Sequence, residues 1–311
     1  MKPYLESVLL IAAIVVGSLV GLYTSLETSL TDFFIIAMLF FLFYNISLKD
    51  FFNGVRDRKY IGIALLSNFA VIPMIAFGLS ALVVGSSSAI FVGLMIYLIA
   101  PCTDWFLGFT KLANGDVEVN SALLPFNLIM QILLLPVYLS LFTANNVGIP
   151  FDAFFDVLIY WVVLPFAVAQ LVRLAVLKLG TKLFEKSSAI SEMLVLVAII
   201  LLVFSIFNSN IESLIENTSV LPSVFLVIIV FFIATFFFAR FISRAFSFPR
   251  KQEISLTMTT AARNAPLMLA ISLIFFPQEP LVHLVLVIGM LVEFPHLITI
   301  TYLLKRGAQS N

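Results

Sequence analysis

The fold depends on the stretch Ile99-Ala100-Pro101-Cys102-Thr103-Asp104-Trp105, which lies inside a long apolar run. Pro101 has no backbone N–H and interrupts a helix, and Asp104 brings a carboxylate to the same place. In hydrocarbon, a carbonyl without a partner and a charged side chain are both costly, so such a cluster is tolerated only where it lines protein or water. The stretch therefore predicts an interrupted membrane helix at a solute-binding site.

The composition excludes an ordinary soluble domain. Of the 311 residues, 62% are hydrophobic and 11% are charged, and the mean hydropathy is +1.14, which is typical of a polytopic membrane protein. The formal net charge is zero, so we expect no nucleic-acid partner. A single cysteine cannot form an intrachain disulfide, and no Cys/His cluster suggests a structural metal or a cofactor. We expect a multi-pass protein of the cell membrane.

Apolar runs of about 20 residues predict ten membrane-spanning helices. The runs cover about 5–26, 31–48, 60–84, 87–113, 118–142, 152–175, 189–209, 220–245, 253–277 and 279–304. Polar turns are expected between them, at 48–50, 85–88, 113–116, 145–148, 181–191 and 208–219. Since no low-complexity linker interrupts the chain, we expect an all-α fold in one transmembrane domain over 1–311.

The lysines and arginines predict the orientation, because cytoplasmic loops retain them. Lys2 precedes the first span and the others follow the second, fourth, sixth, eighth and tenth spans, so every lysine or arginine except Arg263 falls on one face. The loops on the other side carry acidic residues, for example Glu212 and Glu279. This pattern requires an even number of spans and predicts that both termini are cytoplasmic.

Ten spans divide into two groups of five, about 1–145 and 146–311. A unit with an odd number of spans enters the membrane in the opposite direction when it is repeated. The fourth span is interrupted at Pro101, and the ninth is interrupted just before Pro266. Interrupted helices in matching positions point to the binding site of an inverted-repeat transporter. We therefore expect two inverted five-helix repeats with the site at their broken helices.

Three charged residues remain at membrane depth after the loop charges are assigned: Asp104, Arg263 and Glu293. An intramembrane charge is a functional-site hypothesis by default. Asp104 and Arg263 lie on the two broken helices, and a structural ion pair between them is an equally good interpretation. Glu293 has no obvious fixed partner in the sequence. It is either a proton carrier or a static hydrogen-bonded carboxyl.

Uncharged side chains in the same spans leave two interpretations open. Cys102 is either a small buried hydrophobic residue or a thiolate at the site, which would select soft, thiophilic species. The polar side chains either give oxygen ligands to a substrate or ion, or make interhelical hydrogen bonds. These polar residues are Asn68, Thr103, Asn127, Gln131 and Asn264. The phenylalanine-rich runs 33–43 and 231–238 are expected to face lipid.

Short motifs in both halves of the chain resemble those of one known family. The strings are Leu98–Thr103, Leu112–Asp116, Leu66–Pro73, Thr259–Asn264 and Gly289–Pro295. They resemble the arsenite permeases of the arsenical-resistance type, in the bile acid:sodium symporter superfamily. The resemblance implies that the broken fourth and ninth helices cross near the midplane, and that arsenite efflux is coupled to proton entry. By this likeness Cys102 matches the family's substrate-binding cysteine, and Glu293 matches its essential carboxylate.

Two residues depart from the family's pattern. Asp104 stands in place of an apolar residue, and Arg263 in place of a small polar one. A buried arginine binds carboxylates or sulfonates through two hydrogen bonds, which keeps sodium-coupled symport of an organic anion as the alternative. A non-transporting sensor or assembly partner in the bilayer is a third hypothesis. An enzyme is not expected, because neither an H-E-x-x-H nor a G-x-S-x-G string occurs.

The first hypothesis is export of arsenite, with antimonite as a further substrate, by proton antiport. Its predicted substrate ligands are Cys102, Thr103, Asn264, Arg263 and Asn68, with oxygen ligands from Asn127 and Gln131 and helix breaks at Pro101 and Pro266. Glu293 and Asp104 would carry the proton. One thiol cannot surround arsenic with three sulfurs, so we expect one reversible As–S bond and additional oxygen contacts. Because arsenous acid is neutral at physiological pH, uphill export needs a coupled ion.

Overall fold

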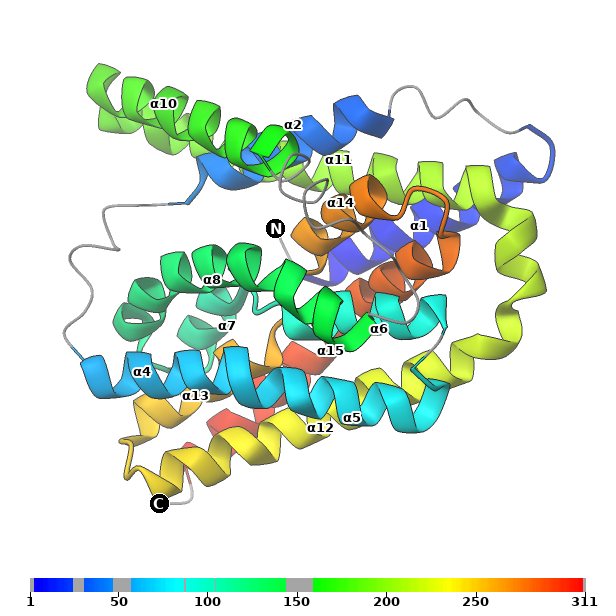
Figure 1. Cartoon of the computed structure of the whole chain (residues 1–311). Coiled ribbons are helices and arrows are strands. Elements are labelled where there is room, and N and C mark those ends of the chain that lie inside the picture. Colours follow the sequence, from blue (N-terminus) through cyan, green and yellow to red (C-terminus); the bar gives the residue numbers. More distant parts are fainter. Residues whose placement is uncertain are drawn as a thin grey trace. The chain divides into compact units, whose positions relative to one another are not determined.

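A computed structural model describes residues 3–24, 31–46, 57–86, 88–103, 105–143 and 159–309, and every regular element in these ranges is a helix (Figure 1). The chain forms two compact units. The first comprises Met1–Ile46, Gly148–Ser219 and Leu269–His283, and the second comprises Ser47–Val147, Val220–Met268 and Leu284–Asn311. The predicted all-helical class is therefore confirmed for the described part of the chain.

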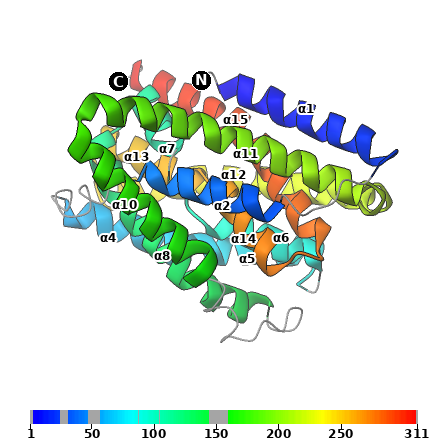
Figure 2. The ribbon, with the colours of Figure 1, turned by 90° about the horizontal axis from the view of Figure 1, so that it is seen from above.

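The first unit is built from four main helices. They are α1 (Pro3–Gly21), α2 (Thr31–Tyr44), α10 (Leu164–Leu179), which the π-helical turn η3 (Ile159–Val163) precedes, and α11 (Thr181–Glu216). Figure 2 shows α1 lying along α11. A Cβ added to Gly17 would lie 2.6 Å from the carbonyl oxygen of Phe204, so the two backbones are close. Small residues permit such approach in lipid, where packing rather than the hydrophobic effect holds helices together.

The second unit contains the remaining helices and all the predicted site residues. Its helices are α4 (Arg58–Leu66), η2 (Ser67–Val71), α5 (Ile72–Val84), α6 (Ala89–Ile99), α7 (Trp105–Leu112), α8 (Val117–Thr143), α12 (Leu221–Ala245), which follows the 3-10 turn η4 (Thr218–Val220), α13 (Arg250–Ala261), the start of α14 (Ala265–Phe275), and most of α15 (Pro280–Gln309). The segments α4, η2 and α5 form one continuous helix, and α12 packs against both α5 and α13 (Figure 1).

Within the described residues, six helices are long and apolar enough to cross a bilayer. They are Arg58–Val84, Val117–Leu141, Ile159–Leu179, Thr181–Glu212, Thr218–Ala245 and Pro280–Lys305. The shorter apolar helices are Val8–Gly21, Phe33–Tyr44, Ala89–Ile99 and Ala265–Phe275. These lengths and compositions are those of a multi-pass membrane protein.

The predicted turn at 181–191 is wrong and the one at 208–219 is confirmed in part, because α11 runs through the first and is kinked within the second. This helix begins directly after Gly180, whose φ of 147° favours glycine, and it includes the whole of 181–191. Within 208–219 the backbone of Asn210 is not helical, with φ −125° and ψ 17°, and it kinks α11 before the helix ends at Glu216. The 3-10 turn η4 then begins at Thr218. The polar side chains mark the ends of a helix that is longer than the roughly 20 residues needed to cross a bilayer. The predicted turns at 48–50 and 145–148 lie outside the described residues.

The prediction that the phenylalanine-rich runs face lipid is wrong for several of their residues. Phe43, Phe231 and Phe232 are buried. The guanidinium carbon of Arg263 lies 5.6 Å from the ring centroid of Phe231. The ring of Phe232 stacks on that of His296, with centroids 3.9 Å apart and planes 7° apart. One side of α12 therefore supplies aromatic faces to polar groups of the second unit.

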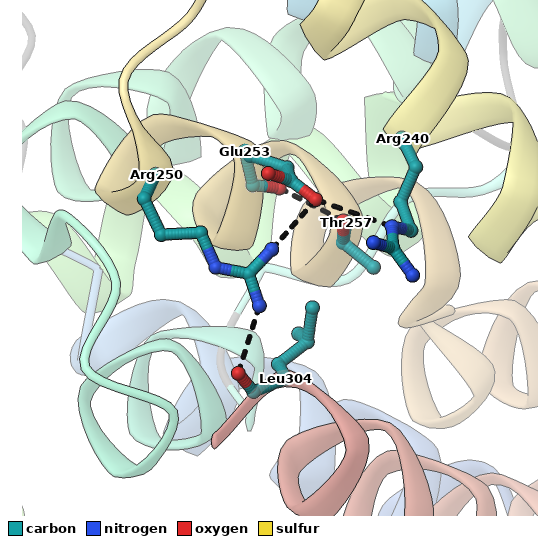
Figure 3. Close-up of polar contacts among 5 residues, drawn as sticks. All are labelled: Arg240, Arg250, Glu253, Thr257 and Leu304. Carbon is teal, nitrogen blue, oxygen red and sulfur yellow. Dashed lines mark hydrogen bonds and ion pairs between the residues drawn. The ribbon is translucent and has the colours of Figure 1, made fainter. Parts of the chain in front are cut away.

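A cluster of charges fixes the beginning of α13 (Figure 3). One carboxylate oxygen of Glu253, Oε1, lies 2.7 Å from Arg250 Nη1 and 3.3 Å from Arg240 Nε. Arg250 Nη2 also donates to the backbone carbonyl of Leu304 at 2.8 Å. An acidic residue in the first turn is favourable beside the positive end of a helix dipole. These contacts join α12, α13 and α15 at one end of the second unit, and α13 leads from there to the site.

Candidate functional site

A proline accounts for each of the two helix breaks. Pro101 lacks a backbone N–H and disfavours helical geometry at the residue before it, so Ala100 is extended, with φ −94° and ψ 109°. Pro266 lies in the first turn of α14, where the missing N–H is harmless, because the first N–H groups of a helix have no partner within it. The helix α6 therefore ends at Ile99. The helix α13 ends at Ala261, because in one continuous helix the ring of Pro266 would clash with the carbonyl of Ala262.

The two extended segments cross each other. The N–H of Cys102 donates to the carbonyl of Ala262 at 3.1 Å, and the N–H of Asn264 donates to the carbonyl of Ala100 at 3.0 Å. Together they form an isolated antiparallel bridge. The backbone groups left without helical partners at one break thus form hydrogen bonds with those at the other. In a membrane interior, backbone polar groups must have such partners. The crossing also brings together two helix carboxyl ends, of α6 and α13, which carry partial negative charge.

The guanidinium of Arg263 lies at these two carboxyl ends. Its Nη1 donates to the carbonyl of Leu98 at 2.9 Å, and its Nη2 donates to the carbonyls of Thr259 at 3.1 Å and Thr260 at 2.7 Å. The residue is completely buried, against the face of Phe231. Its Nε has no hydrogen-bond partner in the described structure. The last carbonyls of two helices and an aromatic face therefore stabilise the buried positive charge.

The predicted ion pair of Arg263 with Asp104 falls partly outside the described residues, because Asp104 is not among them. Its predicted part in proton coupling stays a prediction for the same reason.

Glu293 has a partner that the sequence did not reveal. Its Oε1 accepts a hydrogen bond from the backbone N–H of Arg263 at 2.9 Å, and the residue is only 4% exposed. A buried carboxyl needs such a donor. The bond attaches α15 to the extended segment between α13 and α14.

Cys102 lies at the crossing and is fully buried. Its apolar neighbours come from α7, α13 and α15 and include Phe106, Met258 and Phe294. The thiol therefore lies in the interior of the second unit, and Pro101 and Thr103 are its neighbours in the sequence.

Amide and hydroxyl side chains form a first polar cluster around Thr259. Asn68 Nδ2 donates to Asn127 Oδ1 at 3.3 Å and to Thr259 Oγ1 at 3.1 Å, and Asn127 Nδ2 donates to Thr259 Oγ1 at 3.3 Å. Asn68 belongs to the π-helical turn η2, a type of distortion that is frequent at functional sites. Its Oδ1 has no partner in the described ranges.

A second polar cluster is centred on Asn264. Its Nδ2 donates to Thr103 Oγ1 at 3.0 Å and to Gln131 Oε1 at 3.4 Å. Asn127 and Gln131 are four residues apart on α8 and share one face, so the two clusters lie one helical turn apart. Asn264 Oδ1 and Gln131 Nε2 have no partner in the part of the chain that is described. The structure thus brings the predicted polar residues together beside the crossing.

Sequence reasoning missed Thr259 and Tyr97 as members of the site. Thr259 lies one helical turn before Arg263, and Tyr97 lies one turn before Pro101. The hydroxyl of Tyr97 donates to the carbonyl of Gly289 at 3.0 Å. A polar side chain one turn before a helix break is the signal that points to both, because residues four apart share a face.

Comparisons with known proteins point to one family. The family model described as Sodium Bile acid symporter family matches residues 32–217, more than half of the chain. The arsenical-resistance protein Acr3 of Corynebacterium glutamicum is 22% identical over 260 residues, which cover 79% of this chain and 70% of that protein.

Proposed function

The chain belongs to the Sodium Bile acid symporter family and is a multi-pass membrane transporter, and we propose that it exports arsenite in exchange for protons. Among its relatives is an arsenical-resistance protein. The observation that carries the proposal is the position of the chain's single cysteine, because Cys102 is hydrogen-bonded through its N–H to the second helix break. A soft thiol at the crossing of two broken helices suits a soft, thiophilic solute.

In this proposal Cys102 forms one As–S bond. An As–OH group leaves with the thiol proton as water, and hydrolysis of the As–S bond reverses the step on release. The remaining arsenic hydroxyls donate to and accept from the polar clusters. Asn68 Oδ1, Asn264 Oδ1, Gln131 Nε2 and Arg263 Nε have no partner in the described structure and offer these contacts, with Thr103 and Asn127 beside them. Satisfying buried polar atoms of this kind contributes to affinity.

Glu293 carries the proton in the proposed exchange. As a carboxylate it accepts the N–H of Arg263. As a neutral acid it also has an O–H group that needs an acceptor, which changes the bonding at the break. Asp104, next to Thr103 in the sequence, is proposed as a second carrier. Coupling is required because the membrane potential does not act on a neutral solute.

We also propose ten spans in a single transporter domain, arranged as inverted repeats over about 1–145 and 146–311, with both termini cytoplasmic in the cell membrane. The interrupted pairs α6/α7 and α13/α14 take the same place in the two groups of five, and α8 and α15, which follow them, both contain internal prolines. Each compact unit combines helices from both groups, and this supports a repeated arrangement. Apart from Leu269–His283, the first unit contains two of the five proposed spans of each group. The second unit contains the other three spans of each group.

Arsenite accumulation in everted vesicles under an imposed proton gradient tests the proposal. Cys102→Ala should lose accumulation, and the double variant Cys102→Ala/Ala113→Cys is the matched control. Ala113 belongs to the same buried apolar cluster as Cys102, so the control restores a buried thiol away from the crossing and should remain inactive. Unimpaired arsenite accumulation by Cys102→Ala would refute thiol coordination. Competition by antimonite would extend the substrate class.

Sodium-coupled symport of an organic anion is the second candidate. The description of the family, which names sodium and bile acids, favours it. Vesicles loaded with taurocholate distinguish the two candidates. Anion flux that requires a sodium gradient would support symport, and flux indifferent to sodium would remove it.

A further inference from the structure

Three backbone carbonyl oxygens converge on the guanidinium of Arg263. They belong to Leu98 near the end of α6 and to Thr259 and Thr260 near the end of α13. Backbone carbonyls are ligands that sodium and potassium use in membrane proteins. In transporters with broken helices, the carboxyl ends of half-helices and the unwound carbonyls coordinate the coupling cation.

We propose that the guanidinium of Arg263 takes the place of a monovalent metal ion at the carboxyl ends of α6 and α13. The crossing therefore needs no bound sodium, and the metal site is latent.

The surroundings of the guanidinium select a cation and not an anion. Its Nη atoms donate to protein carbonyls, and the face of Phe231 lies against it. Both carbonyl oxygens and aromatic faces attract positive charge. The carboxylate of Glu293 is bonded to the backbone N–H of the same residue. An arginine that clamped an anionic substrate would direct its Nη pair away from such groups.

The geometry also predicts what removal of the charge would leave. A neutral side chain at position 263 would strand three buried acceptors near a carboxylate, which is costly unless a cation replaces the guanidinium. Sodium or potassium from solution would then bind between the carbonyls. The metal site is therefore latent in the wild-type protein and open in the variant.

The test is thermal stability of the purified chain in detergent without arsenite, with sodium, potassium or choline chloride at equal ionic strength. The wild-type Tm should be the same in all three salts. Arg263→Ala and Arg263→Gln should have a lower Tm in choline, and sodium or potassium should raise it in a saturable way, by roughly 5 °C at a concentration of ~100 Kd. Arg263→Lys keeps a positive charge and should remain indifferent to the cation.

Arg240→Gln is the matched control, because it removes an arginine of the same unit that binds Glu253 at the far end of α13. Its Tm should not respond to sodium specifically. A saturable sodium effect on the wild type would overturn the proposal, because the site would be open. Arg263→Ala or Arg263→Gln that folds but shows no change of Tm with the cation would also overturn it. The same holds if both neutral variants fail to fold in all three salts while Arg263→Lys folds. These readouts contain no solute, so a failure of arsenite export would leave them unchanged.

Discussion

The carboxylate of Glu293 and the backbone N–H of Arg263 are joined by a 2.9 Å hydrogen bond. The side chain of Glu293, in α15, thereby binds the extended segment between α13 and α14. The side chain of Arg263 binds the ends of α6 and α13. Arg263 is thus held through its backbone by a carboxyl oxygen and through its side chain by helix carbonyls. Both contacts lie at the crossing to which Cys102 belongs.

Glu293→Gln should retain the fold and lose proton coupling. Glutamine keeps an oxygen that accepts the Arg263 N–H, but it has no exchangeable proton at physiological pH. Arsenite accumulation driven by a proton gradient should fall to the level of vesicles without the protein, and the residual flux should not depend on pH. Glu279→Gln, at an exposed position, is the control and should transport normally. An unaltered pH dependence in Glu293→Gln would contradict the role of proton carrier.

Thr259→Val should destabilise the protein and impair transport, whereas Thr260→Val should do little. The hydroxyl of Thr259 accepts from both Asn68 and Asn127, and its loss leaves buried amide donors unsatisfied, at a cost of about 1–3 kcal/mol. The hydroxyl of Thr260 bonds only carbonyls of its own helix in the described structure, a contact that contributes little. Thermal unfolding of the two neighbouring variants compares these costs directly. Equal Tm values would argue against a structural role of the cluster around Thr259.

Gly289→Ala should destabilise the contact between α6 and α15. An added Cβ would lie 2.5 Å from the ring of Tyr97, whose hydroxyl also bonds the carbonyl of Gly289. Overpacking of this kind costs about 1–3 kcal/mol. Gly78→Ala makes the same change in α5, where a Cβ would meet nothing within 4 Å, and should be neutral or stabilising by about 0.5 kcal/mol. A normal Tm for Gly289→Ala would show that Tyr97 moves without cost.

Asp57→Ala should lower stability in a way that depends on pH. The carboxylate caps α4, accepting from the Tyr60 N–H at 2.9 Å and from Gln252 Nε2 at 2.7 Å, and loss of such a cap costs about 1 kcal/mol. The Tyr60 N–H, together with the weaker contribution from Gln252, holds the pKa of Asp57 below its usual value of 3.8. Because the folded-state pKa is lowered, the extra stability is present above that usual value and is lost as the pH falls through the folded-state pKa.

The measurement for Asp57 is Tm against pH for the wild type, Asp57→Ala and Asp57→Asn. The difference between wild type and alanine variant should be constant from neutral pH down to about 5 and should shrink below about 4. Asparagine caps helices without a charge. The Tm of Asp57→Asn should therefore vary with pH as that of Asp57→Ala does, but at neutral pH it should be higher than that of the alanine variant. A difference that persists unchanged in acid would disprove the contribution of the carboxylate.

The amino-acid sequence by itself determined the all-helical membrane class and the positions of the two helix breaks. Both follow from local physics: apolar runs match the thickness of a bilayer, and proline lacks the N–H that a helix requires. The predicted turn at 181–191 failed because the same polar residues also suit a helix that extends beyond its apolar part. Polarity marks a change of environment and does not by itself mark a change of direction.

Only the tertiary structure decided which groups meet. Leu98 and Arg263 are 165 residues apart, and Arg263 and Glu293 are 30 apart, and nothing in the spacing of the sequence pairs them. The partners of a buried charge are set by which backbone groups its neighbours leave without bonds, and those groups exist only after the two broken helices have crossed. The sequence therefore identified the unusual residues, and the crossing determined that the arginine binds helix carbonyls while the glutamate binds the arginine's own backbone.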